Sequence, residues 1–213
     1  MNLQEGLNKF DQVYFINLEH RIDRLTHITS ELAKTNINNS KIKRINGYYL
    51  KTFGILGCAK SHIKALEEFL KTPESTKNCI IFEDDFEFTK NMEEVNNLIN
   101  MIFENNINFD VLMLSCNILN SSKTNYSFLT KIIDGQTLSG YCITKKFAPI
   151  LLANYKESVS ILENIGHSVH NFCFDIWMKK LQPNTNWYAI NPLIGKQMTS
   201  YSDIENKIVS YDC

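Results

Sequence analysis

Short apolar segments alternate along the chain with segments whose apolar residues recur at helical spacing. The former are typical of buried strands and the latter of amphipathic helices. We predict strands at residues 13–18, 41–50, 79–82, 111–114, 137–144 and 187–190. We predict helices at residues 21–34, 54–70, 92–103, 145–155 and 174–181. This order predicts an α/β fold, with a mostly parallel sheet flanked by helices, in a single domain over residues 1–213.

The composition is that of an ordinary globular protein. The chain has 213 residues, of which 44% are hydrophobic, and its formal net charge is −1. A near-neutral charge argues against a protein that binds nucleic acid by neutralising phosphates. No apolar run approaches the roughly 20 residues that span a bilayer, and the first residues lack the apolar core of a signal peptide. We therefore expect a cytoplasmic protein without a transmembrane segment, either free or peripheral to a membrane.

The six cysteines are interpreted as reduced and mostly buried thiols. None belongs to a CxxC pair, and the first five lie in apolar or mixed surroundings. This pattern does not favour a disulfide framework or a zinc site.

A cluster of acidic residues follows the strand predicted at residues 79–82. It consists of Glu83, Asp84, Asp85 and Glu87. In an extended chain Glu83, Asp85 and Glu87 would share one face, at the sheet edge where α/β proteins bind ligands. Two such charges about 4 Å apart repel by about 4 kcal/mol at an effective dielectric constant near 20, so a cation or a raised pKa must offset the repulsion. Hard carboxylate oxygens without a nearby thiol or imidazole favour Mg²⁺ or Mn²⁺ over zinc, and the alternative is a solvated acidic turn.

Four short motifs occur in order along most of the chain. They are Val13–Arg24 (VYFINLEHRIDR), Gly57–His62 (GCAKSH), Ile80–Asp85 (IIFEDD) and, after Gln197, Ser202–Ile204 (SDI). Together they resemble the motifs of family 25 glycosyltransferases. That family includes bacterial lipooligosaccharide galactosyltransferases and collagen hydroxylysine galactosyltransferases.

The resemblance implies a Rossmann-like GT-A fold and a metal-dependent, inverting transfer of a hexose. The donor would be a UDP-sugar carrying galactose or glucose, and the acceptor would be a hydroxyl group of a glycan or protein. Mn²⁺ or Mg²⁺ would stabilise the charge that develops on the leaving diphosphate. Asp85 would bind this metal ion, while Glu83 and Asp84 would face the nucleoside.

Arg24 is the candidate for binding the phosphates or the uracil of the donor. Arg21 and Arg24 are the only arginines near the end of the first predicted strand. A guanidinium group can bind phosphate or uracil oxygens in a bidentate manner. The alternative is a helix-surface arginine paired with Asp23 or Glu19.

The resemblance also implicates Ser61 and His62 in shaping the donor site. His62 shares one side of its predicted helix with apolar residues and therefore points inward. The alternative is a core histidine with satisfied contacts. His167 and His170 are interpreted as surface imidazoles, with an accessory metal ligand as the alternative.

An inverting transfer requires a general base beside the acceptor hydroxyl. Asp175 matches an aspartate that precedes a helix in the family pattern, so it is the candidate base. The alternative is a helix N-cap, a role that aspartate favours and that is worth about 1 kcal/mol.

The polar segment at residues 197–213 is the candidate C-terminal lid. Gln197, Ser202 and Asp203 would close over the donor and exclude water. Asp203 would lie beside the metal ion, because a carboxylate would repel bare phosphate. A frayed C-terminus is the alternative.

Two other functions fit the same residues. A metal-dependent phosphohydrolase would also place carboxylates after a strand, although the Asp-x-Asp pattern typical of its nucleophile is absent from the predicted strand ends. A non-catalytic module would bind the nucleotide sugar without transferring or hydrolysing it.

Overall fold

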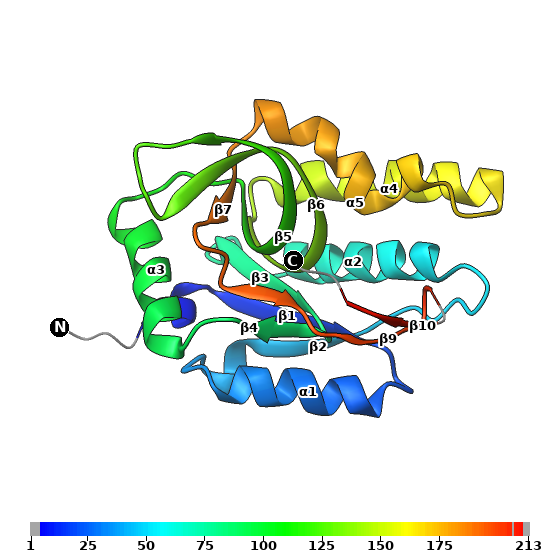
Figure 1. The fold of residues 1–213 in the computed structure, drawn as a ribbon, viewed down its shortest axis with the longest axis horizontal. Coiled ribbons are helices and arrows are strands. Elements are labelled where there is room, and N and C mark those ends of the chain that lie inside the picture. The colour runs from blue at the N-terminus through cyan, green and yellow to red at the C-terminus, as the bar shows by residue number, and fades with distance from the viewer. Residues whose placement is uncertain (1–4, 206, 211–213) are drawn as a thin grey trace.

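The computed structural model describes residues 5–205 and 207–210, and a six-stranded sheet forms its centre (Figure 1). The strands are ordered β2-β1-β3-β6-β5-β7 across the sheet. Their bounds are Gln12–Asn17 (β1), Ile42–Asn46 (β2), Asn78–Glu83 (β3), Val111–Lys123 (β5), Leu129–Thr144 (β6) and Trp187–Ile190 (β7).

The sheet is mostly parallel, with one strand reversed. β1 is parallel to both β2 and β3, and β5 is parallel to β7. β6 is antiparallel to both of its neighbours β3 and β5, so the other five strands run in one direction. The predicted α/β fold is therefore confirmed. The carboxyl ends of β1 and β3 lie side by side, because these two strands are adjacent and parallel.

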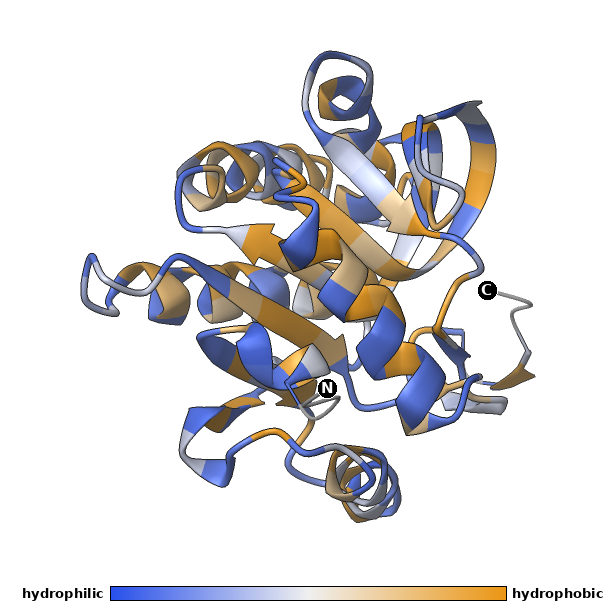
Figure 2. Ribbon diagram, turned by 90° about the vertical axis from the view of Figure 1, so that its left-hand side faces the viewer, coloured by the Kyte–Doolittle hydropathy of each residue, from blue (hydrophilic) through white to orange (hydrophobic). Residues whose placement is uncertain are grey.

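Helices cover both faces of this sheet (Figure 1). They are Ile22–Ala33 (α1), Gly54–Leu70 (α2), Met92–Glu104 (α3), Ala148–Ile165 (α4) and Phe174–Trp177 (α5), with 3₁₀ turns at Gly6–Lys9, Asn39–Lys41, His170–Phe172 and Met178–Asn184. Alternate residues of β1 belong to separate apolar clusters: Tyr14 and Ile16 pack with α2 and α4, whereas Val13 and Phe15 pack with α1 and α3. In Figure 2 the inner strands are mainly hydrophobic and the connecting loops mainly hydrophilic.

β5 and β6 extend well beyond the apolar segments predicted for them. Their outer halves form a hairpin, in which the last five residues of β5 are exposed. Backbone pairing between antiparallel strands holds this polar ribbon together. Apolar periodicity does not detect such a ribbon, because few of its side chains are buried.

The predicted helices differ from the structure mainly in the C-terminal half. α4 continues to Ile165 and ends at Gly166, whose φ of 80° is the left-handed conformation that glycine adopts at low cost. The helix predicted at residues 174–181 is instead the short α5 followed by the 3₁₀ turn, which contains Pro183. Proline lacks the amide hydrogen that a regular helix would require at this position.

Two small strand pairs return the C-terminal segment to the ends of β1 and β3. Phe86–Phe88 (β4) pairs with Gly195–Gln197 (β8), and Ser200–Ser202 (β9) pairs with Lys207–Val209 (β10). These strands of three residues were not predicted, because a segment this short shows no periodicity. Among the described residues, no helix is both long and apolar enough to cross a membrane.

Candidate active site

A pocket lies at the carboxyl ends of β1 and β3, between the loop that precedes α2 and the C-terminal segment. It collects eight of the ten site residues predicted from the sequence. These eight are Arg24, Ser61, Glu83, Asp84, Asp85, Gln197, Ser202 and Asp203. The remaining two, His62 and Asp175, do not line the pocket. His62 lowers the pKa of Glu83, and Asp175 contributes to the raised pKa of Cys58, and both of these affected residues line the pocket.

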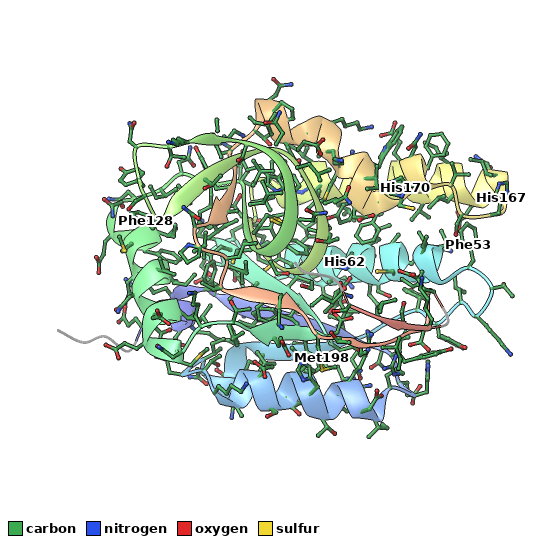
Figure 3. The ribbon with its side chains drawn as sticks, viewed as in Figure 1. Phe53, His62, Phe128, His167, His170 and Met198 are labelled. Atoms are coloured by element: carbon green, nitrogen blue, oxygen red, sulfur yellow. The ribbon has the colours of Figure 1, made fainter. Side chains whose placement is uncertain are left out.

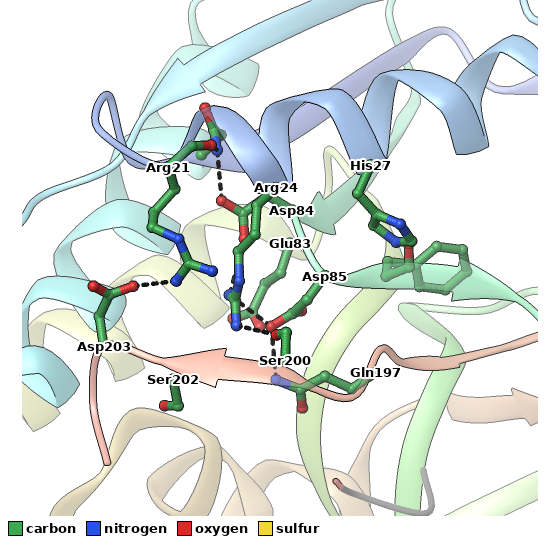
Figure 4. Close-up of polar contacts among 12 residues, drawn as sticks. Arg21, Arg24, His27, Glu83, Asp84, Asp85, Gln197, Ser200, Ser202 and Asp203 are labelled. Carbon is green, nitrogen blue, oxygen red and sulfur yellow. Dashed lines mark hydrogen bonds and ion pairs between the residues drawn. The ribbon is translucent and has the colours of Figure 1, made fainter. Parts of the chain in front are cut away.

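Arg24 forms the centre of the charged contacts in this pocket (Figure 4). Its Nη1 atom lies 3.1 Å from Asp84 Oδ1 and 2.8 Å from Asp85 Oδ2. Asn17, the last residue of β1, donates a hydrogen bond of 2.7 Å from Nδ2 to Asp84 Oδ2. The helix-surface alternative for Arg24 is therefore wrong, because its ion-pair partners are the two aspartates of the acidic cluster.

The acidic cluster does not remain extended. Glu83 is the last residue of β3, and Asp84 and Asp85 form a turn before β4. The turn directs both aspartates toward Arg24, whereas Glu83 contacts Cys58 and His62. The expectation that Glu83 and Asp85 share one face is wrong for this reason.

Burial of Asp85 gives it an unusual pKa. The side chain is almost completely buried, and this burial together with the negative charge of Glu83 raises the pKa of Asp85 to about 7, against the opposing effect of Arg24. Burial also raises the pKa of Asp84. The alternative of a solvated acidic turn is therefore wrong, since both aspartates are buried.

The pocket contains polar atoms that have no hydrogen-bond partner among the residues the structure describes. They are Asn17 Oδ1, Arg24 Nε and Asp85 Oδ1, and all three atoms are buried. Buried polar atoms without partners are uncommon in folded proteins, and they are expected where a ligand completes the hydrogen bonding. All three residues line the pocket.

The donor atoms of the pocket are compatible with a hard divalent cation. Four carboxylates and two guanidinium groups line it, which leaves an excess of two negative charges when all are ionised. Asp85 Oδ1 is an unpaired carboxylate oxygen, the type of ligand that Mg²⁺ and Mn²⁺ prefer, and such ions often use only one or two carboxylates together with phosphate oxygens. Asp85 therefore fits the predicted metal ion, although Arg24 already neutralises its other oxygen.

The described part of the C-terminal segment lies against the two arginines. Arg21 Nη1 donates to the carbonyl oxygen of Tyr201 at 3.0 Å, and Arg24 Nη2 donates to Ser200 Oγ at 2.7 Å. Gln197 Nε2 donates to Asp85 Oδ2 at 2.9 Å. The segment thus contacts Asp85 and the two arginines. Residues 206 and 211–213 of the predicted lid lie outside the described residues.

Asp203 has a cationic partner within the protein. Its carboxylate forms an ion pair with Arg21, which also pairs with Asp23, and His20 Nε2 lies 3.4 Å away (Figure 4). Asp203 therefore does not require a metal ion to balance its charge, because the guanidinium group of Arg21 already does so.

Ser61 shapes the pocket through the backbone. Its hydroxyl donates to the carbonyl oxygen of Gly57 at 2.7 Å and accepts from the amide of Tyr48 at 2.8 Å. A Cβ atom at Gly57 would lie 2.4 Å from the carbonyl oxygen of Tyr48, so only glycine permits this close approach. These contacts fix the loop that presents Tyr48 and Tyr49 at the pocket rim.

His62 lies on α2 and is fully buried (Figure 3). Its Nε2 lies 2.9 Å from Glu83 Oε1 and its Nδ1 lies 3.2 Å from the hydroxyl of Tyr141. Burial favours a raised pKa for Glu83, but the contacts with His62 and Cys58 and the charge of Arg24 together outweigh it, so the pKa of Glu83 is lowered. His62 is thus a satisfied core residue that also orients a carboxylate of the pocket.

Cys58 completes the surroundings of Glu83. Its Sγ atom lies 3.4 Å from Glu83 Oε1, and the side chain is only partly buried. The premise that no thiol or imidazole lies near the acidic cluster is therefore wrong for Glu83. The other cysteines among the described residues are buried as predicted, and Cys213 lies outside the described residues.

Asp175 lies within the first turn of α5 and is not its N-cap. The N-cap is Cys173, and its side chain makes no capping hydrogen bond. The cap alternative is therefore wrong. Burial, followed by the charge of Glu83, raises the pKa of Asp175, which brings it toward the range useful for a general base at neutral pH.

His167 and His170 are both exposed; His167 follows the end of α4, and His170 begins the 3₁₀ turn His170–Phe172 (Figure 3). Within the described residues, neither belongs to a group of side chains that could hold a metal ion. The surface interpretation is confirmed.

Sequence reasoning missed three contributors to the site. Asn17 and Tyr49 line the pocket, and Ser200 binds Arg24. The signal for Asn17 was its position at the end of a buried strand, a place where a polar side chain reaches the ligand-binding edge. Tyr49 was hidden in the strand predicted at residues 41–50, whereas β2 ends at Asn46 and Tyr49 lies in the loop that follows. Ser200 lies in a segment without periodicity, so no comparable signal existed for it.

Comparisons with known proteins assign no family to the chain. No family model and no curated protein matches it. Among solved structures, A197 from STIV aligns with a TM-score of 0.48 and 11% identity over 96% of each chain. A mannose-1-phosphate geranyltransferase from Thermus thermophilus aligns with a TM-score of 0.48 and 9% identity, over 92% of this chain and 76% of that chain. Likeness at this level assigns no function, and the resemblance to family 25 glycosyltransferases stays a prediction.

Proposed function

We propose that the protein is a metal-dependent hexosyltransferase that moves galactose or glucose from a UDP-sugar to a hydroxyl group of a glycan or protein. The observation that supports this proposal is the convergence of three distant segments on one pocket. Arg21 and Arg24, the acidic turn after β3, and the segment from Gln197 to Asp203 all meet there.

The charge of the pocket explains why such a transferase would need a divalent cation. The excess of carboxylates over guanidinium groups would repel a nucleoside diphosphate. Mn²⁺ or Mg²⁺ bound by Asp85 would reverse this repulsion and would stabilise the charge of the departing diphosphate. Arg24 and Arg21 would exchange part of their present carboxylate contacts for phosphate oxygens.

The remaining residues have roles in the same proposal. The ring of Tyr49, half exposed at the rim, offers a surface on which the nucleobase can stack. Asp175 does not line the pocket, but the charge of Glu83 acts on it, so it would accept the proton of an acceptor hydroxyl bound beside the pocket, and its raised pKa suits that task. The segment from Gln197 to Asp203 would have to move to admit the donor, because it now seals Asp85, and would then close again to exclude water.

A screen of nucleotide sugars tests this proposal. The purified chain is incubated with UDP-galactose, UDP-glucose and other donors, with Mn²⁺ or with a chelator, and the released nucleotide is measured. We expect slow, Mn²⁺-dependent release of UDP from at least one UDP-hexose. Binding of the donor without release would identify a non-catalytic module, and release of phosphate from simple monoesters would identify a phosphohydrolase.

A further inference from the structure

We infer that Cys58, His62 and Glu83 form a second cation site, distinct from the one proposed at Asp85, that binds a borderline-soft divalent metal ion such as Zn²⁺. The inference is independent of the proposed transferase activity. It follows from three ligand atoms that the fold brings together: the Cys58 thiol, the His62 imidazole and the Glu83 carboxylate all lie within 4.8 Å of one another.

The three ligands come from two regular elements of the fold, α2 and β3. Cys58 and His62 lie four positions apart on α2, so their side chains project from the same face in successive turns. Glu83 ends the central strand β3, and its Oε1 atom lies 3.4 Å from Cys58 Sγ and 2.9 Å from His62 Nε2. Neighbouring ligands of a tetrahedral Zn²⁺ ion are roughly 3.3–3.7 Å apart, given bonds of about 2.0–2.3 Å. Since all three ligand atoms lie within 4.8 Å of one another, shifts of about 1 Å would bring them to such separations.

The surroundings of the histidine suit a metal ligand. His62 presents Nε2 toward the site, while its other nitrogen, Nδ1, lies 3.2 Å from the hydroxyl of Tyr141. Metal-binding histidines usually have such a partner on the second nitrogen, since it fixes the ring orientation and the tautomer. Phe174 packs on the same imidazole ring, with 4.9 Å between ring centroids, and further limits its rotation.

Charge and access also favour this site. A thiolate and a carboxylate together balance a divalent ion, and the thiol proton leaves to solvent when the metal binds. Cys58 and Glu83 line the pocket, so an ion can reach them from there. Three protein ligands leave a fourth coordination position, which would face the pocket and take water or a substrate oxygen.

Titration of the chelator-treated full chain with Co²⁺ tests the inference without any sugar donor. We expect one Co²⁺ per chain with the strong visible absorption of tetrahedral cobalt and a thiolate-to-metal charge-transfer band in the near ultraviolet, both abolished by added Zn²⁺. Cys58→Ser should remove the charge-transfer band. Tyr141→Phe should weaken binding by about 10- to 100-fold, as is typical for loss of an outer partner.

Two matched controls separate this site from others. Cys173→Ser changes a cysteine outside the cluster and should keep the band, as should Asp85→Asn, which removes the ligand of the other proposed cation. Circular dichroism of each variant verifies folding. A wild-type chain without the band, or a band that survives Cys58→Ser, would overturn the inference and would leave the proposed transferase activity untouched.

Discussion

Glu83 and Asp85 lie two positions apart in one acidic motif, yet their surroundings shift the pKa values of the two carboxyl groups in opposite directions. Glu83 ends β3, contacts His62 and Cys58, and has a lowered pKa. Asp85 lies in the following turn, is buried beside Arg24 and Gln197, and has a pKa raised to about 7. The turn therefore separates Glu83, which faces the Cys58 thiol and the His62 imidazole, from Asp85, which faces the guanidinium group of Arg24.

This difference indicates that the two halves perform different tasks. Asp85 carries an unpaired oxygen next to the arginines, where a nucleoside diphosphate and a hard cation would bind. Glu83 is held by α2 and faces a softer set of ligands. Substitutions at the two positions should consequently have different effects, and the predictions below exploit this.

The largest effect is expected from Asp85→Asn on sugar transfer. Loss of the carboxylate removes the proposed metal ligand, and we expect release of UDP from the donor to fall by about 100- to 1,000-fold, the range seen when one group that stabilises the transition state is removed. Glu87→Gln is the matched control, because Glu87 pairs with Lys196 outside the pocket. Equal activity of Asp85→Asn and Glu87→Gln would contradict the role of Asp85.

Arg24→Met should strongly destabilise the fold. It would leave Asp84 and Asp85 buried without their cation, and removal of one partner from a buried ion pair costs about 3–5 kcal/mol. Urea unfolding measures the loss. Lys43→Met breaks a largely exposed pair with Glu68 and should cost no more than about 1 kcal/mol. Similar losses for the two variants would show that Arg24 is not the buried counter-ion of the aspartates.

The two carboxylates should respond in opposite directions to neutralisation. Because the pKa of Asp85 is raised in the folded state, its ionisation lowers stability as the pH rises from about 4 through about 7. Asp85→Asn should therefore raise the melting temperature at pH 8, by about 2–4 °C for each kcal/mol gained, and this gain should shrink toward pH 4. The lowered pKa of Glu83 means that its ionised form stabilises the fold at neutral pH, so Glu83→Gln should lower the melting temperature at pH 8.

Thermal unfolding in the presence of a chelator measures both variants across this pH range. Shifts of the same sign at pH 8 would show that the two environments do not differ as described.

The smallest effect is expected in the C-terminal segment. Amide hydrogen exchange at residues 197–210 should slow when UDP and Mn²⁺ are both present, because the segment would then close on the diphosphate as well as on Arg21 and Arg24. UDP alone or Mn²⁺ alone should have little effect. If UDP and Mn²⁺ together leave the exchange rates unchanged, the segment does not close over the diphosphate as a lid.

The sequence predicted the site best where polar or charged residues directly follow a buried strand. The polar residues after β1 and β3 were predicted to share one edge of the sheet, and they do. Helix α2 was predicted with the bounds Gly54–Leu70 that the structure has, because its apolar side is continuous. The apolar periodicity of a segment and the succession of strands and helices along the chain can be recognised from neighbouring residues alone, and the structure confirms what both predicted for these elements.

The partners of each charge could not be predicted from the sequence. Arg24 and Asp84 are 60 positions apart, and Arg21 and Asp203 are 182 positions apart. The turn that separates Glu83 from Asp85 depends on contacts with α1 and the C-terminal segment, which no local pattern encodes. For the same reason, Cys58 and His62 were interpreted separately, although both contact Glu83.

Calorimetric titration of the chain with UDP tests the central claim most directly, which is that the pocket beside Asp85 and Arg24 binds a nucleoside diphosphate together with a divalent cation. The excess of carboxylates predicts that UDP binds in the presence of Mn²⁺, that it binds far more weakly with a chelator, and that Asp85→Asn abolishes the difference. Absence of UDP binding with Mn²⁺, or equal binding with and without it, would contradict the account.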